Sequence, residues 1–468
     1  MARGKKKEIL TPEERLQAAL VPESEQPYEV PANWCWVRLG SLLSEIKNGT
    51  TIKQDKSGIG YKVTRIESLQ NQTIDFNRLG TIVNEQEIKD TDWYLVGDIA
   101  LSHINSAEHV GKTALIGVDM LPLVHGMNLL RLRFYNKCCM PILFQYFSQS
   151  FQYKNEILSR INMAVNQVSI NQKQLRSLEF PLPPFLEQQR IVDRIESLFA
   201  KLDEAKQKAQ DALDSFEARK SAILHKAFTG ELTTQWRKEH GVGMESWEKT
   251  ILKKVCEVNP KKIDTKGLPD DLEVSFFPMT SLSEIYGEIT EPQTRLLKDV
   301  KTGFTNFSEG DVVFAKITPC MENGKSAIIG KLVNEIGYGT TEFYVLRCRE
   351  NLYNRYLYHM IRDLTFRHQA KSVMAGAVGQ QRVPKQFMEN YPLDLPSVSE
   401  QTEIVRILDD LLAKEQQAKE AAEKVLEQID LIKKSILARA FRGELGTNDP
   451  SEESAVELLR QVLSTSDR

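Results

Sequence analysis

Residues 180–232 read FPLPPFLEQQRIVDRIESLFAKLDEAKQKAQDALDSFEARKSAILHKAFTGEL, and a second copy, YPLDLPSVSEQTEIVRILDDLLAKEQQAKEAAEKVLEQIDLIKKSILARAFRGEL, covers residues 391–445. Glu187-Gln188 matches Glu400-Gln401, and Gly230-Glu231-Leu232 matches Gly443-Glu444-Leu445, in each case 213 positions later. A repeat at a fixed spacing indicates that two copies of one structural unit follow each other along the chain.

Each copy predicts one long helix, because prolines precede it and a glycine follows it. Helices of about forty residues are roughly 60 Å long. Apolar residues at alternating steps of three and four predict a coiled-coil seam, interrupted at Arg219 and Glu415. An ordinary amphipathic helix on a globular core is the alternative. The predicted seam residues are Ile195, Leu198, Leu202, Phe216 and Ile223 in the first helix, and Leu408, Leu411, Val425, Ile429, Ile432 and Ile436 in the second.

The composition fits two globular domains that share a helical spine, since 468 residues suffice for roughly three units. No apolar run is long enough to span a membrane, and the start, MARGKKKEIL, lacks the apolar stretch of a secretory signal. The six cysteines form no CxxC pair, which favours reduced thiols in a cytoplasmic protein. A net charge of −3 argues against an independent nucleic-acid binder, but not against a subunit whose partner adds positive charge.

Six segments follow from these patterns. Residues 1–30 form an N-terminal arm with a short helix from Leu10 to Leu20, which is either a flexible tail or a docking element for the Leu16 and Leu20 face. The others are a globular domain over 31–184, a central spacer helix over 185–232, a globular domain over 233–396, a C-terminal spacer helix over 397–445, and a polar tail over 446–468 that contains one short helix.

The two globular domains repeat each other as well. GDIALSHINSAEHVGKTALI (97–116) aligns with GDVVFAKITPCMENGKSAII (310–329), again 213 positions later. Short β-like runs recur in both domains and are followed by a predicted helix, over 141–158 and over 352–370. We therefore expect an α+β fold with an internal tandem repeat, two domains joined by two long antiparallel helices, and pseudo-two-fold symmetry. B-DNA has local two-fold symmetry too, and paired readers on a spacer suit a two-part target.

The chain resembles the specificity subunit of type I restriction-modification systems. The resemblance is carried by PLPPFLEQQRIV (181–192), SAILHKAFTGELTTQWR (221–237), SEQTEIV (399–405) and KSILARAFRGEL (434–445), and it covers nearly the whole chain. It implies two target-recognition domains on an antiparallel spacer, which read two half-sites of double-stranded DNA across a nonspecific gap. It also implies two methyltransferase subunits and motor-nuclease subunits as partners, with S-adenosylmethionine, ATP and Mg bound by those partners. The N-terminal arm departs from the family pattern.

Motifs for catalysis are missing or incomplete. Gly111-Lys112-Thr113 and Gly324-Lys325-Ser326 resemble the end of a phosphate-binding loop, but Ser106 and Pro319 stand where its first glycine belongs. We interpret both as a turn followed by a strand. LPPF (182–185) is similar to the catalytic tetrapeptide of amino-methyltransferases, but Leu182 stands where that motif needs a polar Asn or Asp. The seven histidines form no HExxH pattern. We therefore predict no catalytic residue, no metal site and no enzyme activity.

Polar side chains on loops and strand ends are the candidates for DNA contacts, because base edges need donors and acceptors and phosphates need Lys or Arg. The amide-rich segment from Asn166 to Gln174 and its counterpart near Gln380 are the densest. For any single residue, a solvated surface side chain is the alternative. The candidates are Lys62, Thr64, Arg65, Ser102, His103, Asn105, Ser106, Lys112, Gln167, Ser169 and Asn171 in the first domain, and Thr280, Ser281, Lys316, Thr318, Asn323, Lys325, Gln380, Gln381, Arg382 and Lys385 in the second.

The sequence thus favours a non-catalytic DNA-recognition subunit. A coiled-coil scaffold that binds only proteins is the rival, and the acidic pI of about 6.3 suits it best. An isolated methyltransferase or nuclease is a third possibility, which the missing motifs disfavour.

Overall fold

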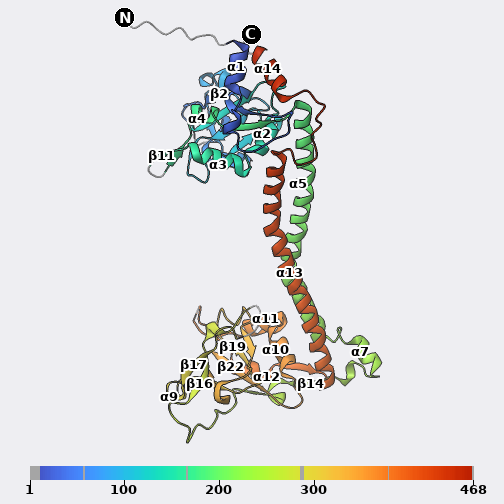
Figure 1. The fold of residues 1–468 in the computed structure, drawn as a ribbon. Coiled ribbons are helices and arrows are strands. Elements are labelled where there is room, and N and C mark those ends of the chain that lie inside the picture. The colour runs from blue at the N-terminus through green and yellow to red at the C-terminus, as the bar shows by residue number, and fades with distance from the viewer. Residues whose placement is uncertain (1–10, 56–57, 165–166, 285–288, 378, 466–468) are drawn as a thin grey trace. The chain divides into compact units, whose positions relative to one another are not determined.

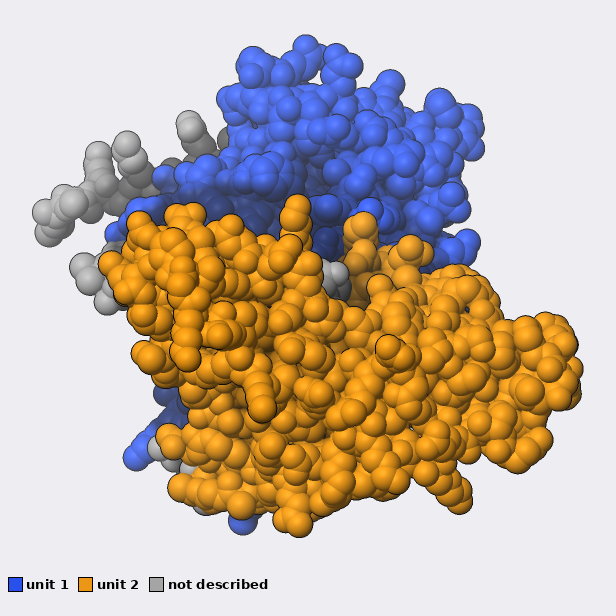
Figure 2. All heavy atoms as spheres, turned by 90° about the horizontal axis from the view of Figure 1, so that it is seen from below, with its two compact units in different colours: residues 1–208, 425–468 blue, residues 209–424 orange. Residues whose placement is uncertain are grey.

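The computed structural model describes residues 11–55, 58–164, 167–284, 289–377 and 379–465, which form two compact units (Figure 1). Unit 1 comprises residues 1–208 and 425–468, and unit 2 comprises residues 209–424, as coloured in Figure 2. The long helices α5 (Phe185–Asp214) and α13 (Val398–Ala440) each contribute one part to each unit. The first ten residues of the predicted arm and Asn166 of the amide-rich segment lie outside the described residues.

Unit 1 is built around a four-stranded sheet in the order β2-β10-β7-β9, all neighbours antiparallel. Unit 1 also contains a three-stranded sheet, β11-β12-β8, and the two-stranded sheets β1-β13, β3-β6 and β4-β5. The elements are α1 (Pro12–Ala19), β1 (Cys35–Arg38), β2 (Leu43–Asn48), β3 (Tyr61–Val63), β4 (Leu69–Gln70), β5 (Thr73–Ile74), β6 (Gly80–Ile82), β7 (Ile99–Ser102), β8 (Ile104–Asn105), β9 (Thr113–Leu115), β10 (Leu129–Phe134), α2 (Pro141–Phe147), α3 (Phe151–Arg160), β11 (Asn162–Ala164), β12 (Gln167–Ser169), α4 (Gln172–Arg176), β13 (Glu179–Leu182) and α14 (Ala455–Thr465).

Unit 2 repeats this plan. Its sheet β15-β22-β19-β20 has the strand order of the first sheet, and β14-β23 corresponds to β1-β13. A mixed sheet, β17-β16-β21-β18, is added. The elements are α6 (Phe216–Phe228), α7 (Thr234–Glu239), β14 (Glu248–Ile251), α8 (Leu252–Val255), β15 (Cys256–Val258), β16 (Glu273–Phe277), β17 (Gln293–Leu296), α9 (Leu297–Val300), β18 (Thr305–Phe307), β19 (Val312–Ala315), β20 (Ser326–Ile328), β21 (Gly337–Gly339), β22 (Phe343–Cys348), α10 (Asn354–Arg362), α11 (Leu364–Ser372), α12 (Lys385–Asn390) and β23 (Pro392–Leu395).

The predicted helices after the sheets are each divided in two. Ser150 caps α3 by accepting from the amide of Tyr153, and Asp363 caps α11 by accepting from the amide of Thr365. Ser and Asp favour such caps over the helix interior, because their oxygens satisfy amides that lack a partner in the first turn. The cap residues stand 213 positions apart, so the same interruption occurs in both units.

The N-terminal arm packs against the C-terminal tail within unit 1. Thr11 and Glu14 form a reciprocal capping box at the start of α1. Leu16 and Ala19 are buried in the same cluster as Ala455 and Leu459 of α14, and Figure 1 shows the two helices side by side. The docking alternative is therefore correct for the described part of the arm, and its docking surface belongs to the chain itself.

The predicted central helix is broken at Ser215, which separates α5 from α6. The Ser215 hydroxyl donates to the carbonyl oxygen of Asp211 at 2.7 Å, and Arg219 donates to the carbonyl oxygen of Ala212 at 3.1 Å. Side chains that bond carbonyls of the preceding turn compete with the helix's own hydrogen bonds and bend it. The prediction of one uninterrupted helix over 185–232 is wrong for this reason.

Two of the residues predicted for the seam of α13, Val425 and Ile432, are exposed, and the residue after each of them is half-buried instead. Val425 and Ile432 are 38% and 43% exposed, whereas their neighbours Leu426 and Lys433 are half-buried. The residues that face the packed side are Leu408, Leu412, Lys419, Ala422, Leu426, Ile429, Lys433 and Ile436. Leu411 is half-buried but outside the apolar cluster that includes Leu412.

Two lysines occupy seam positions, which an apolar count overlooks. The Lys419 ammonium lies 5.1 Å from the ring centre of Phe216 in unit 2, and the Lys433 ammonium lies 4.9 Å from that of Phe199 in unit 1. An ammonium over the face of an aromatic ring is attracted by the ring's electrons, so a lysine can occupy such a position. The first-helix seam residues Ile195, Leu198, Leu202, Phe216 and Ile223 are all buried or half-buried, as predicted.

The repeated Glu-Gln pair joins the start of each long helix to its domain. Gln188 accepts from the Met140 amide at 2.8 Å and donates to the carbonyl oxygens of Cys138 and Pro183. Gln401 accepts from the Tyr353 amide at 2.8 Å and donates to the carbonyl oxygens of Asn351 and Pro396, each 213 positions later. A buried amide with every bond made fixes one orientation of the domain on the helix.

The neighbouring glutamates are clamped by different groups in the two units. In unit 1, Glu187 accepts hydrogen bonds from the neutral side chains of Trp34, Thr447 and Asn448. In unit 2, Glu400 accepts from Trp247 at 3.0 Å and Thr233 at 2.7 Å, and pairs with Arg237 at 2.7 Å. Both clamps connect a helix start to the segment that follows the end of the opposite helix.

Candidate nucleic-acid interface

In unit 1 the structure brings together two predicted segments that lie far apart in the sequence. β12 pairs with β8, so that Val168 lies opposite Asn105 and Ser169 opposite Ile104. The amide of Ile170 donates to the carbonyl oxygen of His103 at 2.9 Å. Asn105, Ser106, Gln167 and Ser169 of the prediction therefore belong to one polar surface, which we call the unit 1 junction, and each is exposed or half-exposed.

Unit 2 forms the same junction at the corresponding positions. Ile317 pairs with Arg382, 213 positions after Ile104 and Ser169. The Val383 amide donates to the carbonyl oxygen of Lys316 at 2.9 Å, and the Thr318 amide to that of Gln381 at 3.0 Å. The unit 2 junction comprises the exposed or half-exposed side chains of Lys316, Thr318, Gln380, Gln381 and Arg382.

The two junctions share a backbone frame but carry different side chains. Ser169 of unit 1 corresponds to Arg382 of unit 2, and His103 corresponds to Lys316. Arg382 makes a bidentate ion pair with Glu342, both contacts 2.8 Å, and this hydrogen-bonded pairing lowers the pKa of Glu342. Lys316 lies 5.3 Å from the ring centre of Tyr344, and burial lowers its pKa. Cationic groups are therefore concentrated at the unit 2 junction.

In each unit, the aspartate of the repeated Gly-Asp pair binds an arginine of the neighbouring central strand. Asp98 accepts two hydrogen bonds from Arg133, both 2.7 Å, and Asp311 accepts from Arg347 at 2.8 and 2.7 Å. Asp98 also accepts from the amide of Leu95, and Asp311 from that of Ser308. Bidentate Arg–carboxylate pairs are directional, so they hold the central strands in one register.

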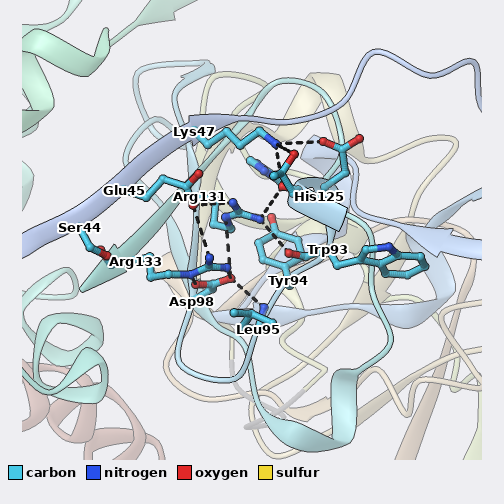
Figure 3. Close-up of polar contacts among 12 residues, drawn as sticks. Ser44, Glu45, Lys47, Trp93, Tyr94, Leu95, Asp98, His125, Arg131 and Arg133 are labelled. Atoms are coloured by element: carbon cyan, nitrogen blue, oxygen red, sulfur yellow. Dashed lines mark hydrogen bonds and ion pairs between the residues drawn. The ribbon is translucent and has the colours of Figure 1, made fainter. Parts of the chain in front are cut away.

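Unit 1 extends this network into its interior, as Figure 3 shows. Arg131 is 1% exposed, donates to Glu45 at 2.5 Å, and donates to the carbonyl oxygen of Trp93 at 2.8 Å. His125 lies nearby and bonds the carbonyl oxygen of Leu129 at 3.0 Å. Burial, reinforced by the Arg131 charge, lowers the pKa of His125 to about 3, so this imidazole is neutral at physiological pH.

Three predicted DNA contacts are wrong because their side chains are buried. Thr64 is fully buried and accepts from the amide of Gly126 at 2.9 Å. Ser281 donates to the carbonyl oxygen of Glu291 at 2.8 Å, and Ser102 accepts from Asn105 at 3.2 Å. A small hydroxyl residue looks the same in sequence whether it reads a ligand or satisfies a buried backbone group.

The remaining candidates lie outside the two junctions or already serve the fold. Asn171 caps α4 by accepting from the Gln174 amide at 2.9 Å. Arg65 pairs with Glu67 at 3.0 Å, Lys385 pairs with Glu389 at 3.0 Å, and Asn323 donates to Glu284 at 3.1 Å. Lys62 and Thr280 are exposed, and Lys112 and Lys325 are half-exposed.

The two Gly-Lys turns have the conformation that a turn before a strand requires. Gly111 and Gly324 have φ of +81° and +75°, and they precede β9 and β20. A Cβ at Gly111 would come within 3.0 Å of Ile157. The interpretation as a turn followed by a strand is confirmed.

We did not predict from the sequence that Glu187-Gln188 and Glu400-Gln401 hold the starts of the long helices on their domains, although both pairs stood out as part of the repeat. All four side chains are buried at the starts of long helices, where polar residues are ordinarily exposed. Polar residues that recur at a fixed spacing beside proline segments were the signal that could have found them.

Comparison with known proteins gives the family. A family model described as the type I restriction modification DNA specificity domain matches residues 31–213 and again residues 244–428. The chain belongs to this family. The two specificity domains contain the two junctions, and their tandem arrangement in one chain agrees with the predicted duplication.

Relatives of the specificity-domain family support the assignment. The chain is 35% identical over 260 residues to the type I restriction enzyme EcoAI specificity subunit of Escherichia coli, a match that spans 47% of this chain and 44% of that protein. It is 29% identical over 438 residues to the putative MjaX specificity subunit of Methanocaldococcus jannaschii, spanning 89% and 95%. The crystal structure of the HsdS subunit from Thermoanaerobacter tengcongensis shares the fold, with a TM-score of 0.63, 18% identity, and coverage of 90% and 100%.

The family also decides the question of catalysis. Specificity subunits are non-catalytic components that recognise DNA, so the prediction that this chain is not an enzyme is confirmed.

Within the described residues, no helix combines the length and apolar character that a membrane crossing requires. The same residues contain no cluster of three or more His, Cys, Asp or Glu side chains able to hold a metal ion.

Proposed function

We propose that this chain reads a two-part DNA sequence, one part with each specificity domain. The proposal is supported above all by the two junctions, which repeat one backbone frame and present different side chains at corresponding positions. A shared frame places both sets of side chains at corresponding positions, while Ser169 against Arg382 and Asn105 against Thr318 give each set its own hydrogen-bonding pattern. Different half-sites would follow, since base edges are distinguished by donors and acceptors.

The two long helices act as the spacer in this proposal. Along α6, contacts with α13 pass from Phe216–Lys419 to Arg219–Glu415, so residue numbers rise on one helix as they fall on the other. An antiparallel coiled coil with pseudo-two-fold symmetry would keep the readers at a fixed separation, and the DNA between the half-sites would be unread.

Catalysis belongs to partner subunits. We assign two methyltransferase subunits and, through them, motor-nuclease subunits to the complex, by analogy with the family resemblance. S-adenosylmethionine, ATP and Mg would bind those partners, and the complex would act on DNA in the cytoplasm. The rival, a scaffold that binds only proteins, would keep the helices but give the junctions no role with DNA.

In vitro selection tests the proposal. The full chain, assembled with its methyltransferase partner, is used to enrich duplexes from a random pool, with the partner alone as control. Enrichment of two short elements at a constant separation supports the proposal. If the complex is stable but enriches no sequence, the rival function, a scaffold that binds only proteins, is favoured.

A further inference from the structure

Unit 2 contains a pocket of about 700 Å³ between α6, α10, α11 and α13. Figure 1 shows α10 and α11 beside the part of α13 that belongs to unit 2. No residue of the unit 2 junction lines the pocket, and its lining includes the basic side chains of Lys220 and Arg367. None of the predicted DNA contacts except Asn323 takes part in it.

Most carboxylates that line this pocket form ion pairs with cations other than Lys220 and Arg367. Asp409 bonds Arg355 at 2.6 Å and His359 at 3.0 Å. Glu415 pairs with Arg219, and Glu322 pairs with Lys371. Because these negative charges are already balanced, they leave little to compensate the other basic groups of the pocket.

Lys220 and Arg367 lack a carboxylate partner within ion-pair distance in the described part of the chain. Arg367 donates through Nη1 to the carbonyl oxygen of Glu322 at 2.7 Å, and its Nε is buried without an acceptor among the described residues. Burial lowers the pKa of Lys220 despite attraction from Glu217, and the positive charges of Arg362 and Arg367 lower it further. Uncompensated donors of this kind are costly, so a bound acceptor would stabilise them.

Unit 1 provides an internal comparison, because its corresponding lysine is paired. Lys433, 213 positions after Lys220, contacts Asp203 at 2.6 Å. The position that corresponds to Asp203 in unit 2 is Gln416, which lines the pocket. Gln149 of unit 1 is replaced by Arg362 as well. Unit 2 has thus lost a carboxylate and gained a guanidinium at the same place in the repeat.

We propose that this pocket binds a phosphate group between Lys220 and Arg367. An ammonium and a guanidinium are the two side chains that recognise phosphate oxygens best, the first as a point charge and the second through paired donors. The phosphate is either a phosphodiester of bound DNA, which rests on the proposed function, or a free phosphate compound, which does not.

Calorimetry and DNA titration of the full chain separate these sources. Inorganic phosphate is titrated at low ionic strength into wild type, Lys220→Gln, Arg367→Gln and the matched control Lys433→Gln. Binding to a DNA duplex is then measured at several salt concentrations. One phosphodiester contact contributes about 0.9 to the slope of log K against log salt concentration.

For a free phosphate compound, we expect saturable binding of one phosphate, weakened at least tenfold by the Lys220 and Arg367 substitutions and unchanged in Lys433→Gln. For a DNA phosphodiester, either substitution lowers the salt slope by up to about 0.9, the value of the one shared phosphate, again without an effect of the control. Gln416→Asp, which restores the carboxylate of unit 1, should weaken binding as Lys220→Gln does while keeping every cation. Because this variant retains Lys220 and Arg367, weaker binding in it cannot be attributed to a folding defect caused by the loss of a basic side chain.

The proposal is overturned if wild type binds no phosphate and all variants share one salt slope, or if Lys433→Gln has the same effect as Lys220→Gln. A chain that binds phosphate but no DNA would contradict the proposed function and leave the pocket assignment intact.

Discussion

Removing the charge of Glu400 should destabilise unit 2 far more than the same change at Glu187 destabilises unit 1. Glu400 pairs with Arg237 at 2.7 Å, and the two side chains are 1% and 7% exposed. Glu400→Gln keeps the shape of the side chain but leaves the guanidinium buried without its counter-charge. Breaking a buried pair in this way costs about 3–5 kcal/mol in free energy of unfolding.

Glu187→Gln is the matched control, since the donors to Glu187 among the described residues are neutral: Trp34 at 2.7 Å, Asn448 at 2.8 Å and Thr447 at 3.2 Å. Its loss should cost about 1.5–3 kcal/mol, the value of hydrogen bonds to a charged group. Because the chain has two units, hydrogen exchange at the starts of α5 and α13 is a better assay than one global melting curve.

A double variant separates charge from packing. Arg237→Met in the Glu400→Gln background removes the unpaired guanidinium, so much of the stability lost in Glu400→Gln should return. If Glu400→Gln costs no more than Glu187→Gln, or if the Arg237 substitution adds a full further loss, the charge pairing does not hold unit 2 together as inferred.

Three further predictions concern the seam, the interior network and the junction. Ile429→Ala should cost about 2–5 kcal/mol and Ile432→Ala less than about 1 kcal/mol, because these residues are 2% and 43% exposed; equal losses in urea denaturation would contradict the corrected seam. Because the pKa of His125 in the folded protein is lowered to about 3, its contribution to stability is complete above about pH 6.5 and declines as the pH falls toward 3. At pH 5 the free energy of unfolding of unit 1 should be lower by about 2 kcal/mol than at neutral pH. His125→Gln should remove this dependence from melting curves recorded across the pH range. Arg382→Ala should relax base preference at one half-site by about 1–3 kcal/mol, as measured by selection from randomised duplexes, whereas a uniform loss across all sequences would make Arg382 a phosphate contact.

Much of the fold follows from local sequence signals. The strands around Ile99 and Val312 and the start of α1 after Thr11 lie where periodicity and capping rules place them. These features depend on neighbours close in the chain, so a single sequence specifies them.

Features that depend on distant contacts were harder to predict. The seam was misplaced at Val425 and Ile432. Lys419 and Lys433 are half-buried, with their ammonium groups over Phe216 and Phe199, and a charged residue gives no apolar signal in the sequence. Thr64 and Ser281 were assigned to the surface because only the folded structure reveals the backbone groups that they satisfy. The pairing of β8 with β12 joins segments whose proximity no local pattern specifies.

Base-resolution mapping of methylated adenine would show whether this chain reads two half-sites at a fixed separation. The chain is co-expressed with its methyltransferase partner, and cells with the partner alone serve as control. We predict methylation at a two-part motif with one constant gap. We also predict that substituting Arg382 changes only one of the two parts. Methylation at a contiguous motif would contradict the two-reader arrangement, and a stable complex without sequence-dependent methylation would contradict DNA recognition itself.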